Sequence, residues 1–289
     1  MSRKKIFLIL IMLIGITSLV YGINHMFFSP TKINSFIASK IYKSPANTAF
    51  TDENFYKCVI DAYNKENSTS LSYTTNLSDE QLKTIKRLSC FSKKITSVNG
   101  VEKLTSLINL NISYNQLTEL DVSKNTLLEI LGVFNNQLTE LDVSNNSALT
   151  YLSVSGNQLT KLDVSKNTKL THLDVHYNKL MELDVSGNTV LKELDVYKNK
   201  LTVLDISGNT ALKELNVDGN QLTKLDVSNN PALTKLSVYN NQLTELDMSN
   251  NVALTHLYAY RNQLTKLDVS TSPALTKLSV YNNQLAELD

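Results

Sequence analysis

The chain has 289 residues, a length typical of one or two domains. Its 28 Lys and Arg nearly balance its 27 Asp and Glu. The charge is unevenly divided, since residues 1–104 are net positive and residues 105–289 are net negative. Nucleic-acid binding depends on cationic contacts to phosphate, so we predict no nucleic-acid partner for the acidic part.

The chain begins with a segment typical of export signals. Basic residues 3–5 precede a largely apolar run over residues 6–23. In such a segment the positive end stays in the cytoplasm. The run is long for a cleaved peptide and just long enough to span a bilayer. Residues 1–25 are therefore either a signal peptide cleaved near Gly22 or a membrane-anchor helix, and the rest of the chain is predicted to be exported, at the cell surface or secreted.

Residues 26–48 are predicted to be a linker. Apolar residues at positions 33, 36, 37 and 41 fall at helical spacing among lysines. The segment is either a short helix lying on a membrane surface or an unstructured tether.

Residues 49–99 contain two short helical patterns. The first covers residues 51–66 and places five residues on one helical face: Phe55, Cys58, Val59, Ala62 and Tyr63. The second begins at Ser78, which forms a capping box with Gln81, and continues as an apolar stripe over Leu82, Ile85 and Leu88. Because a stacked array needs its first core face covered, we interpret residues 49–99 as a helical N-terminal cap.

The cap contains both cysteines of the chain, Cys58 and Cys90. In an oxidising compartment such a pair forms a disulfide, and we predict that bridge. The closed loop of about thirty residues would add ~3–4 kcal/mol in the chain-entropy model. The alternative is a pair of buried free thiols.

A period of 21 residues governs residues 100–289. Nine leucines recur at this interval, from Leu107 to Leu275, and each begins the pattern L-x-x-L-x-V-x-x-N, with Ile112 and Ala259 in place of Val in the first and eighth copies. The closing asparagine is present in all nine copies, from Asn115 to Asn283. This pattern is a leucine-rich repeat, and it predicts a solenoid of nine repeats.

Each repeat consists of two similar halves, because the LDVS half that starts at Leu117 has Leu, Leu, Val and Asn at the same offsets. Apolar residues alternate inward and the chain turns at Asn. The expected fold is a flattened coil with a parallel β-ladder on one side and either a second ladder or tight extended turns on the other. Stacked Asn side chains are expected to hydrogen-bond the turn backbone of the neighbouring rung.

The outward positions of the LDVS half barely vary. Carboxylates ~4.8 Å apart on neighbouring rungs repel each other. We therefore expect hydrogen bonds from Ser hydroxyls or turn N–H groups to compensate them, or a cation such as Ca²⁺ shared between rungs. The column comprises Asp121, Asp142, Asp163, Asp184, Asp205, Asp226, Asp247, Asp268 and Asp289.

The outward positions of the other half change on every rung, and tyrosines gather towards its C-terminal end. Tyrosine is enriched in interfaces because it offers rigid contact area with a polar tip. A solvated sheet face is the alternative. We predict that this face binds a protein or a glycan, over an area of ~500 Å². The predicted binding residues are Phe134, Tyr151, His172, His176, Tyr197, Tyr239, His256, Tyr258, Tyr260, Arg261 and Tyr281.

A metal site is considered on the strand that carries His172, Asp174 and His176, which alternate and face outward, with Asp195 one rung away. The two histidines lie ~13 Å apart along an extended strand, so one ion cannot reach both. We predict no metal and no cofactor. No nucleophile–base pair, phosphate loop or paired-carboxylate pocket is evident elsewhere, so we predict that the chain is not an enzyme.

The repeat LTELDVSxNxxLxxLxVxxNQ, preceded by CVIDAYNKEN, LSDEQLKTIKRLSC and ITSVNGVEKLTSL, resembles the internalin family of Gram-positive bacterial surface proteins. The 21-residue period is closest to the internalin J type, and the resemblance covers about residues 49–289. It implies a helical cap fused to a leucine-rich-repeat domain that is displayed at the cell surface. It also implies adhesion or binding to a host protein, as in virulence factors.

Two departures from the family pattern bear on this resemblance. Internalin J-like repeats often carry a Cys ladder at inward sites that hold Val here, such as Val154 and Val238. The sequence also stops at Asp289 within a repeat, without a sorting signal or a second hydrophobic segment. We therefore expect no covalent attachment to the cell wall. The alternative function is a structural protein that self-associates through an uncapped final rung.

Overall fold

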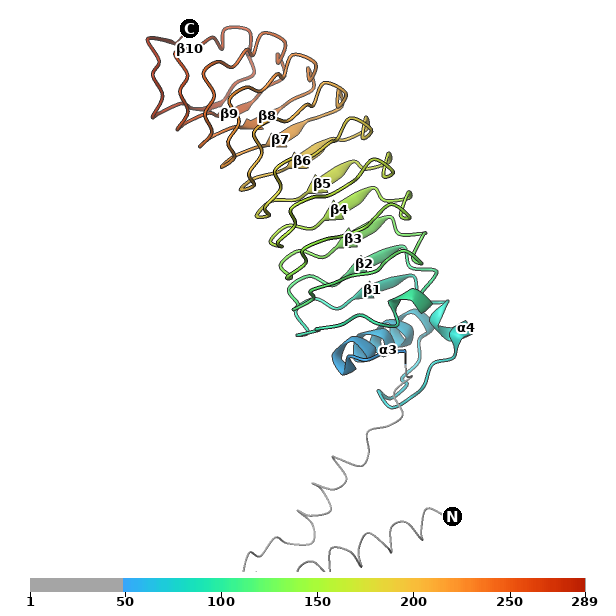
Figure 1. The fold of residues 1–289 in the computed structure, drawn as a ribbon. Helices are drawn as coiled ribbons and strands as arrows, with labels where there is room; N and C mark the ends of the chain where they lie inside the picture. Colours follow the sequence, from blue (N-terminus) through green and yellow to red (C-terminus); the bar gives the residue numbers. More distant parts are fainter. Residues whose placement is uncertain (1–48, 289) are drawn as a thin grey trace, which may run out of the picture. The chain divides into compact units, whose positions relative to one another are not determined.

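The computed structural model describes residues 49–288 (Figure 1). The predicted signal or anchor over residues 1–25 and the predicted linker over residues 26–48 lie outside the described residues. Within the described part, no helix is long and apolar enough to cross a membrane.

Helix α3 (Glu53–Asn67), the first in the described residues, covers the first edge of the coil and packs against strand β1 (Arg87–Ser89) (Figure 1). Asp52 caps its start by accepting hydrogen bonds from two backbone N–H groups of the first turn. The predicted inward face is confirmed, because Phe55, Cys58, Val59 and Ala62 are buried and Tyr63 packs against the core. Tyr56 and Ile60 are buried as well.

The second predicted helix is shorter than its apolar stripe. Helix α4 (Asp79–Leu82) has the predicted capping box between Ser78 and Gln81, but it ends at Leu82. Leu88 lies instead in strand β1, which pairs with strand β2 (Asn109–Asn111). The stripe was misleading because inward residues three apart also suit a chain that leaves a helix and enters a strand. The sheet therefore begins inside the predicted cap.

A short 3₁₀ helix, η1 (Val101–Lys103), connects the cap to the repeats. From there the chain winds as the predicted coil, and its strands form one parallel ten-stranded sheet in the order β1 to β9 and then β11. Every strand pairs in register with the equivalent residues of the next repeat, as Leu194 does with Leu215. The strands after β2 are β3 (Ile130–Gly132), β4 (Tyr151–Ser153), β5 (His172–Asp174), β6 (Glu193–Asp195), β7 (Glu214–Asn216), β8 (Lys235–Ser237), β9 (His256–Tyr258) and β11 (Lys277–Ser279).

The other side of the coil consists mainly of turns. In the described residues its ladder is limited to the pairing of β10 (Lys266–Leu267) with β12 (Glu287–Leu288) and a bridge between Asp121 and Asp142. The expected compensation of the aspartate column is confirmed for Asp121 to Asp268, whereas Asp289 lies outside the described residues. Asp163, for example, accepts a 2.8 Å hydrogen bond from the N–H of Ser165, and its hydrogen bonds with Ser165 lower its pKa. The same bond recurs from Asp121 to Asp268.

The interior is built from columns of Leu and Val closed by two ladders of buried asparagines. In one ladder, Asn199 donates to the carbonyls of Val175 and Val196, at 3.0 Å each, and accepts from the N–H of Leu180 at 3.0 Å. These are the predicted bonds between rungs. In the other ladder, Asn209 donates to two carbonyls of the preceding rung, and its own side-chain oxygen is buried without a hydrogen-bond partner.

The cysteines Cys58 and Cys90 are free, buried thiols in this structure, so the predicted disulfide is not formed in it. The two side chains are in hydrogen-bond contact because α3 packs directly on β1. That contact lowers the pKa of Cys58, whereas burial raises the pKa of Cys90. Formation of the bridge on export remains a prediction.

Candidate binding site on the β-face

We call the outward side of the ten-stranded sheet, with the first residues of the turns that follow its strands, the β-face. The side chains of Leu173, on β5, and Val175, directly after it, are buried. His172, Asp174 and His176 therefore face outward together, as the alternation predicts.

A hollow of about 500 Å³ lies in the β-face over β4 to β9. Four carboxylates line it, from Asp174, Glu193, Asp195 and Glu214, beside the basic side chain of Lys235. We call this the acidic hollow. Its other lining residues are Tyr151, His172, Leu173, Leu194, Leu215, Asn216, Ser237, Tyr239, Tyr258 and Tyr260.

The ion pairs around the acidic hollow are exposed and weak. Lys235 lies 3.5 Å from Glu214, and the ring of His172 lies 3.1 Å from Glu193. Pairs of this kind contribute little, because water and salt screen them. With four carboxylates and one lysine, the hollow is acidic in composition.

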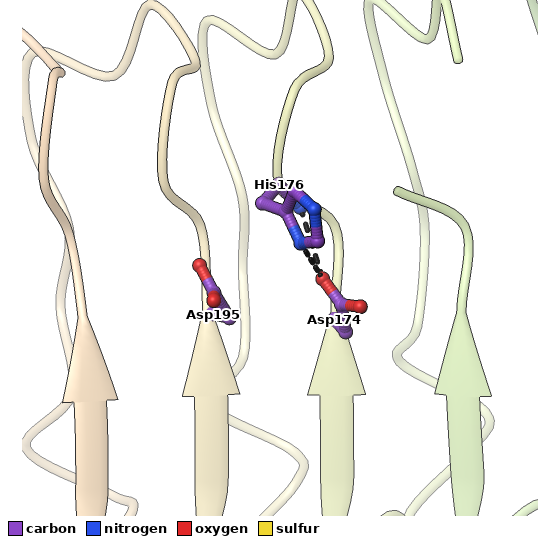
Figure 2. A group of neighbouring side chains, drawn as sticks. All are labelled: Asp174, His176 and Asp195. Atoms are coloured by element: carbon purple, nitrogen blue, oxygen red, sulfur yellow. Dashed lines mark hydrogen bonds and ion pairs between the residues drawn. The ribbon is translucent and has the colours of Figure 1, made fainter. Parts of the chain in front are cut away.

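Asp174 and Asp195, which line the hollow, lie close to His176 (Figure 2). The His176 ring nitrogen Nδ1 lies 2.5 Å from Asp174 Oδ1, and this hydrogen bond raises the pKa of His176. Burial raises the pKa of Asp174, but its bonds to His176 outweigh that effect and lower it. Burial and the neighbouring charge of Asp174 raise the pKa of Asp195.

Asp218 is a buried carboxyl next to the hollow. It occupies the rung between Tyr197 and Tyr239, whose ring centroids lie 6.3 Å apart, and it is only 3% exposed. It accepts hydrogen bonds from the Ser237 hydroxyl at 2.6 Å and the Tyr239 N–H at 2.8 Å. Burial nevertheless raises the pKa of Asp218 to about 7.

A row of stacked rings borders the hollow at its C-terminal end. The rings of Tyr239 and Tyr260 stack with centroids 4.3 Å apart, and those of Tyr260 and Tyr281 with centroids 4.5 Å apart. We call these three residues the tyrosine ladder. Because the rings cover one another's faces, the ladder offers mainly ring edges and hydroxyls.

The structure brings most of the predicted binding residues together. Five of them line the acidic hollow: Tyr151, His172, Tyr239, Tyr258 and Tyr260. Tyr281 extends the tyrosine ladder, and Tyr197 and His176 border the hollow, their ring centroids 6.4 Å apart.

The other three predicted residues lie outside the hollow. Phe134 joins Phe91 and Tyr114 in a separate aromatic cluster at the N-terminal end, 5.3 Å from the Tyr114 ring. His256 hydrogen-bonds Thr255 through Nδ1 at 2.8 Å. Arg261 lies in an exposed turn with φ 55°.

The acidic character of the hollow was not predicted from the sequence, and Glu193 and Glu214 are the clearest cases of lining residues that were not singled out. The signal was present, since Glu193 and Glu214 are 21 residues apart and must face the same way on neighbouring rungs. Tyr177 was also missed. Its left-handed turn conformation, with φ 51°, brings its ring to 5.0 Å from Tyr197.

Known proteins match this chain over different lengths. A family model described as the LVIVD repeat matches residues 131–160. Internalin J of Listeria monocytogenes serotype 4b is 42% identical over 80 residues, which are 28% of this chain and 8% of that protein.

Among solved structures, the functional domain of InlJ from Listeria monocytogenes, which includes a cysteine ladder, is 36% identical with a TM-score of 0.65, over 84% of this chain and 62% of that chain. An internalin, inlF, from the same species is 26% identical with a TM-score of 0.76, over 84% of this chain and 73% of that chain.

The parallel coil, its Leu, Val and Asn columns and these matches define a leucine-rich-repeat protein. The chain is internalin-like, as the likeness to Internalin J in sequence and to InlJ and inlF in structure shows. The internalins that it resembles support the prediction that the chain is not an enzyme. It spans 8% of Internalin J and 62% of the solved InlJ chain.

Proposed function

We propose that this chain is an exported binding protein, at the cell surface or secreted, that adheres to a host protein through its β-face. Export is supported by the N-terminal sequence, in which basic residues 3–5 precede the apolar run of residues 6–23. Recognition of a partner is supported by the internalin-like fold and by the contrast between the two surfaces of the coil.

That contrast is the observation that carries the proposal. The LDVS side repeats the same Asp and Ser, and each of these aspartates from Asp121 to Asp268 is used in its own turn. The β-face instead combines an acidic hollow of about 500 Å³ with a tyrosine ladder, and its residues change from rung to rung. A concave site with aromatic and charged side chains is typical of recognition surfaces.

The ladder favours a protein over a glycan. Sugars pack against open aromatic faces, but the faces of Tyr239 and Tyr260 are occupied by their stacking at 4.3 Å. Ring edges and hydroxyls suit hydrogen bonding and close packing with a polypeptide. The negative hollow beside them would attract basic side chains of a protein partner and accelerate its association.

The test is binding of the full chain to arrays of purified host surface proteins and glycans. The test variant changes the four C-terminal tyrosines of the β-face to serine: Tyr239, Tyr258, Tyr260 and Tyr281. We expect the wild type to bind a protein and the variant to bind it about tenfold more weakly, since tyrosines that a partner covers in an interface are frequent hot spots.

A matched control changes four exposed apolar residues outside the sheet to serine: Leu127, Met181, Val203 and Val252. It removes apolar surface of the same kind away from the β-face, so its binding should be unchanged. Binding to a glycan alone, or binding lost in the control but kept in the tyrosine variant, would contradict the proposal. Far-UV circular dichroism confirms that both variants fold.

A further inference from the structure

The cluster of Asp174, His176 and Asp195 has the composition of a metal site (Figure 2). Asp174 and Asp195 are directly paired residues of β5 and β6, and His176 follows Asp174 by two positions. One potential ligand atom from each of the three lies within 4.8 Å of the other two. Small side-chain rotations would therefore bring all three around one ion.

Neighbouring rungs hold both carboxylates in orientation. Asp174 Oδ2 accepts a hydrogen bond from the Ser153 hydroxyl at 2.9 Å. Asp195 accepts from the N–H of Tyr197 at 2.9 Å and from the amide of Asn216 at 3.2 Å. Outer contacts of this kind fix the direction of metal ligands and are a usual part of metal sites.

The negative charge of Asp174 and Asp195 also favours binding of a cation. Both carboxylates are partly buried, and among the described residues neither forms an ion pair with Lys or Arg. The basic side chain beside them is His176, which hydrogen-bonds Asp174. Two adjacent carboxylates in a partly dry site repel each other, and a divalent cation between them would remove that repulsion.

We propose that Asp174, His176 and Asp195 bind one divalent transition-metal ion of the zinc class. Two carboxylate oxygens and one imidazole nitrogen suit Zn²⁺ and its neighbours, whereas Mg²⁺ and Ca²⁺ prefer oxygen ligands alone. Three protein ligands leave a further position for water or for a group of a partner. The site does not use His172, so the sequence argument against a metal shared by His172 and His176 does not apply to it.

The site goes beyond the proposed binding function and does not depend on it. Asp174 and Asp195 line the acidic hollow, so a bound ion would change the charge that a partner meets there. Metal binding is measured without any partner, and its failure would leave the proposed recognition of a host protein untouched.

The test is titration calorimetry of the full, metal-free chain with ZnCl₂ at neutral pH. We expect one Zn²⁺ per chain. His176→Ala or Asp195→Asn should lower the affinity for Zn²⁺ by more than about a hundredfold. Even the loss of a residue that only hydrogen-bonds a metal ligand lowers metal affinity by about 10- to 100-fold. Co²⁺ gives an independent readout, since its visible absorption should appear in the wild type and disappear in both variants.

The matched control is His172→Ala, on the same strand and face but outside the cluster. The affinity of this variant for Zn²⁺ should equal that of the wild type. Absence of saturable Zn²⁺ binding, unchanged binding in His176→Ala, or loss of binding in His172→Ala would overturn the proposal. Asp195→Asn preserves the shape of the side chain and its bond to Tyr197, so it carries the test even if His176→Ala folds poorly.

Discussion

At the scale of single residues, the most informative side chain is Asp218. The groups that face it are the carboxylate of Asp195, the ammonium of Lys235, the Ser237 hydroxyl and the backbone of Tyr239. Its hydrogen bonds stabilise the anion, yet burial outweighs them and raises its pKa from 3.8 to about 7. Ionisation of Asp218 therefore destabilises the folded chain.

This destabilisation predicts a specific dependence of the free energy of unfolding on pH. Between pH 3.8 and 7 the unfolded chain has lost the proton that folded Asp218 retains, so the free energy of unfolding falls as pH rises through that window. Asp218→Asn should flatten this slope and stabilise the protein above pH 7 by up to about 4 kcal/mol, the equivalent of three pKa units. Urea denaturation from pH 4 to 8 measures the effect.

The control for this prediction is Asp205→Asn in the LDVS half. Hydrogen bonds from Ser207 lower the pKa of Asp205, so its contribution is present above its unfolded pKa and is lost as pH falls through the lower folded value. Its replacement should not stabilise the protein at pH 8. Equal responses of the two variants would show that Asp218 is not the origin of the slope.

At the scale of elements, the two asparagine ladders differ in what each member supports. Loss of Asn199 removes three hydrogen bonds and leaves the buried N–H of Leu180 without a partner, although the carbonyls of Val175 and Val196 keep bonds from Asn178 and Asn220. Loss of Asn209 removes two bonds, leaves no backbone group unpaired, and also removes an unpartnered oxygen.

Asn199→Ala should therefore be more destabilising than Asn209→Ala. We expect about 3 kcal/mol for the first and about 1 kcal/mol for the second, from about 1 kcal/mol per bond and the extra cost of a buried unpaired N–H. Equilibrium urea denaturation of both variants, with unchanged m values, checks the difference. An equal loss would mean that the cavity left by the side chain, and not its bonds, sets the cost.

The same scale shows how far the sequence predicts this structure. The 21-residue period, the inward Leu and Val, and the outward direction of His172 and Asp174 follow from alternation alone, because each short strand must bury its central leucine. Strand β1 does not follow, since Leu88 satisfies a helical stripe and a strand equally well. The acidic hollow and the burial of Asp218 depend on how side chains from neighbouring rungs lean over one another, which no local pattern encodes.

At the scale of the whole molecule, stability should be nearly a sum over repeats, because each rung contacts only its neighbours. Deletion of residues 200–220 removes one period of 21 residues and keeps every later strand in register. The shortened chain should fold cooperatively, with an m value lower by about a tenth, in proportion to the surface lost. Deletion of residues 200–209 removes only half a period and moves the later strands to the turn side. This shorter deletion should abolish unfolding in a single cooperative transition.

The full-repeat deletion also separates the two proposed sites. It removes Glu214, Asn216 and Asp218 from the β-face, and places Ser237 beside Asp195 in the position that Asn216 holds. Asp174, His176 and Asp195 stay in place. We therefore expect the deleted chain to bind Zn²⁺ within about tenfold of the wild type, since only one outer contact changes, but to lose the protein partner that the acidic hollow selects. Calorimetry with ZnCl₂ and the protein array, run on the same preparation, check both expectations. Loss of both activities in a folded chain would show that the metal cluster does not bind Zn²⁺ independently of the deleted rung.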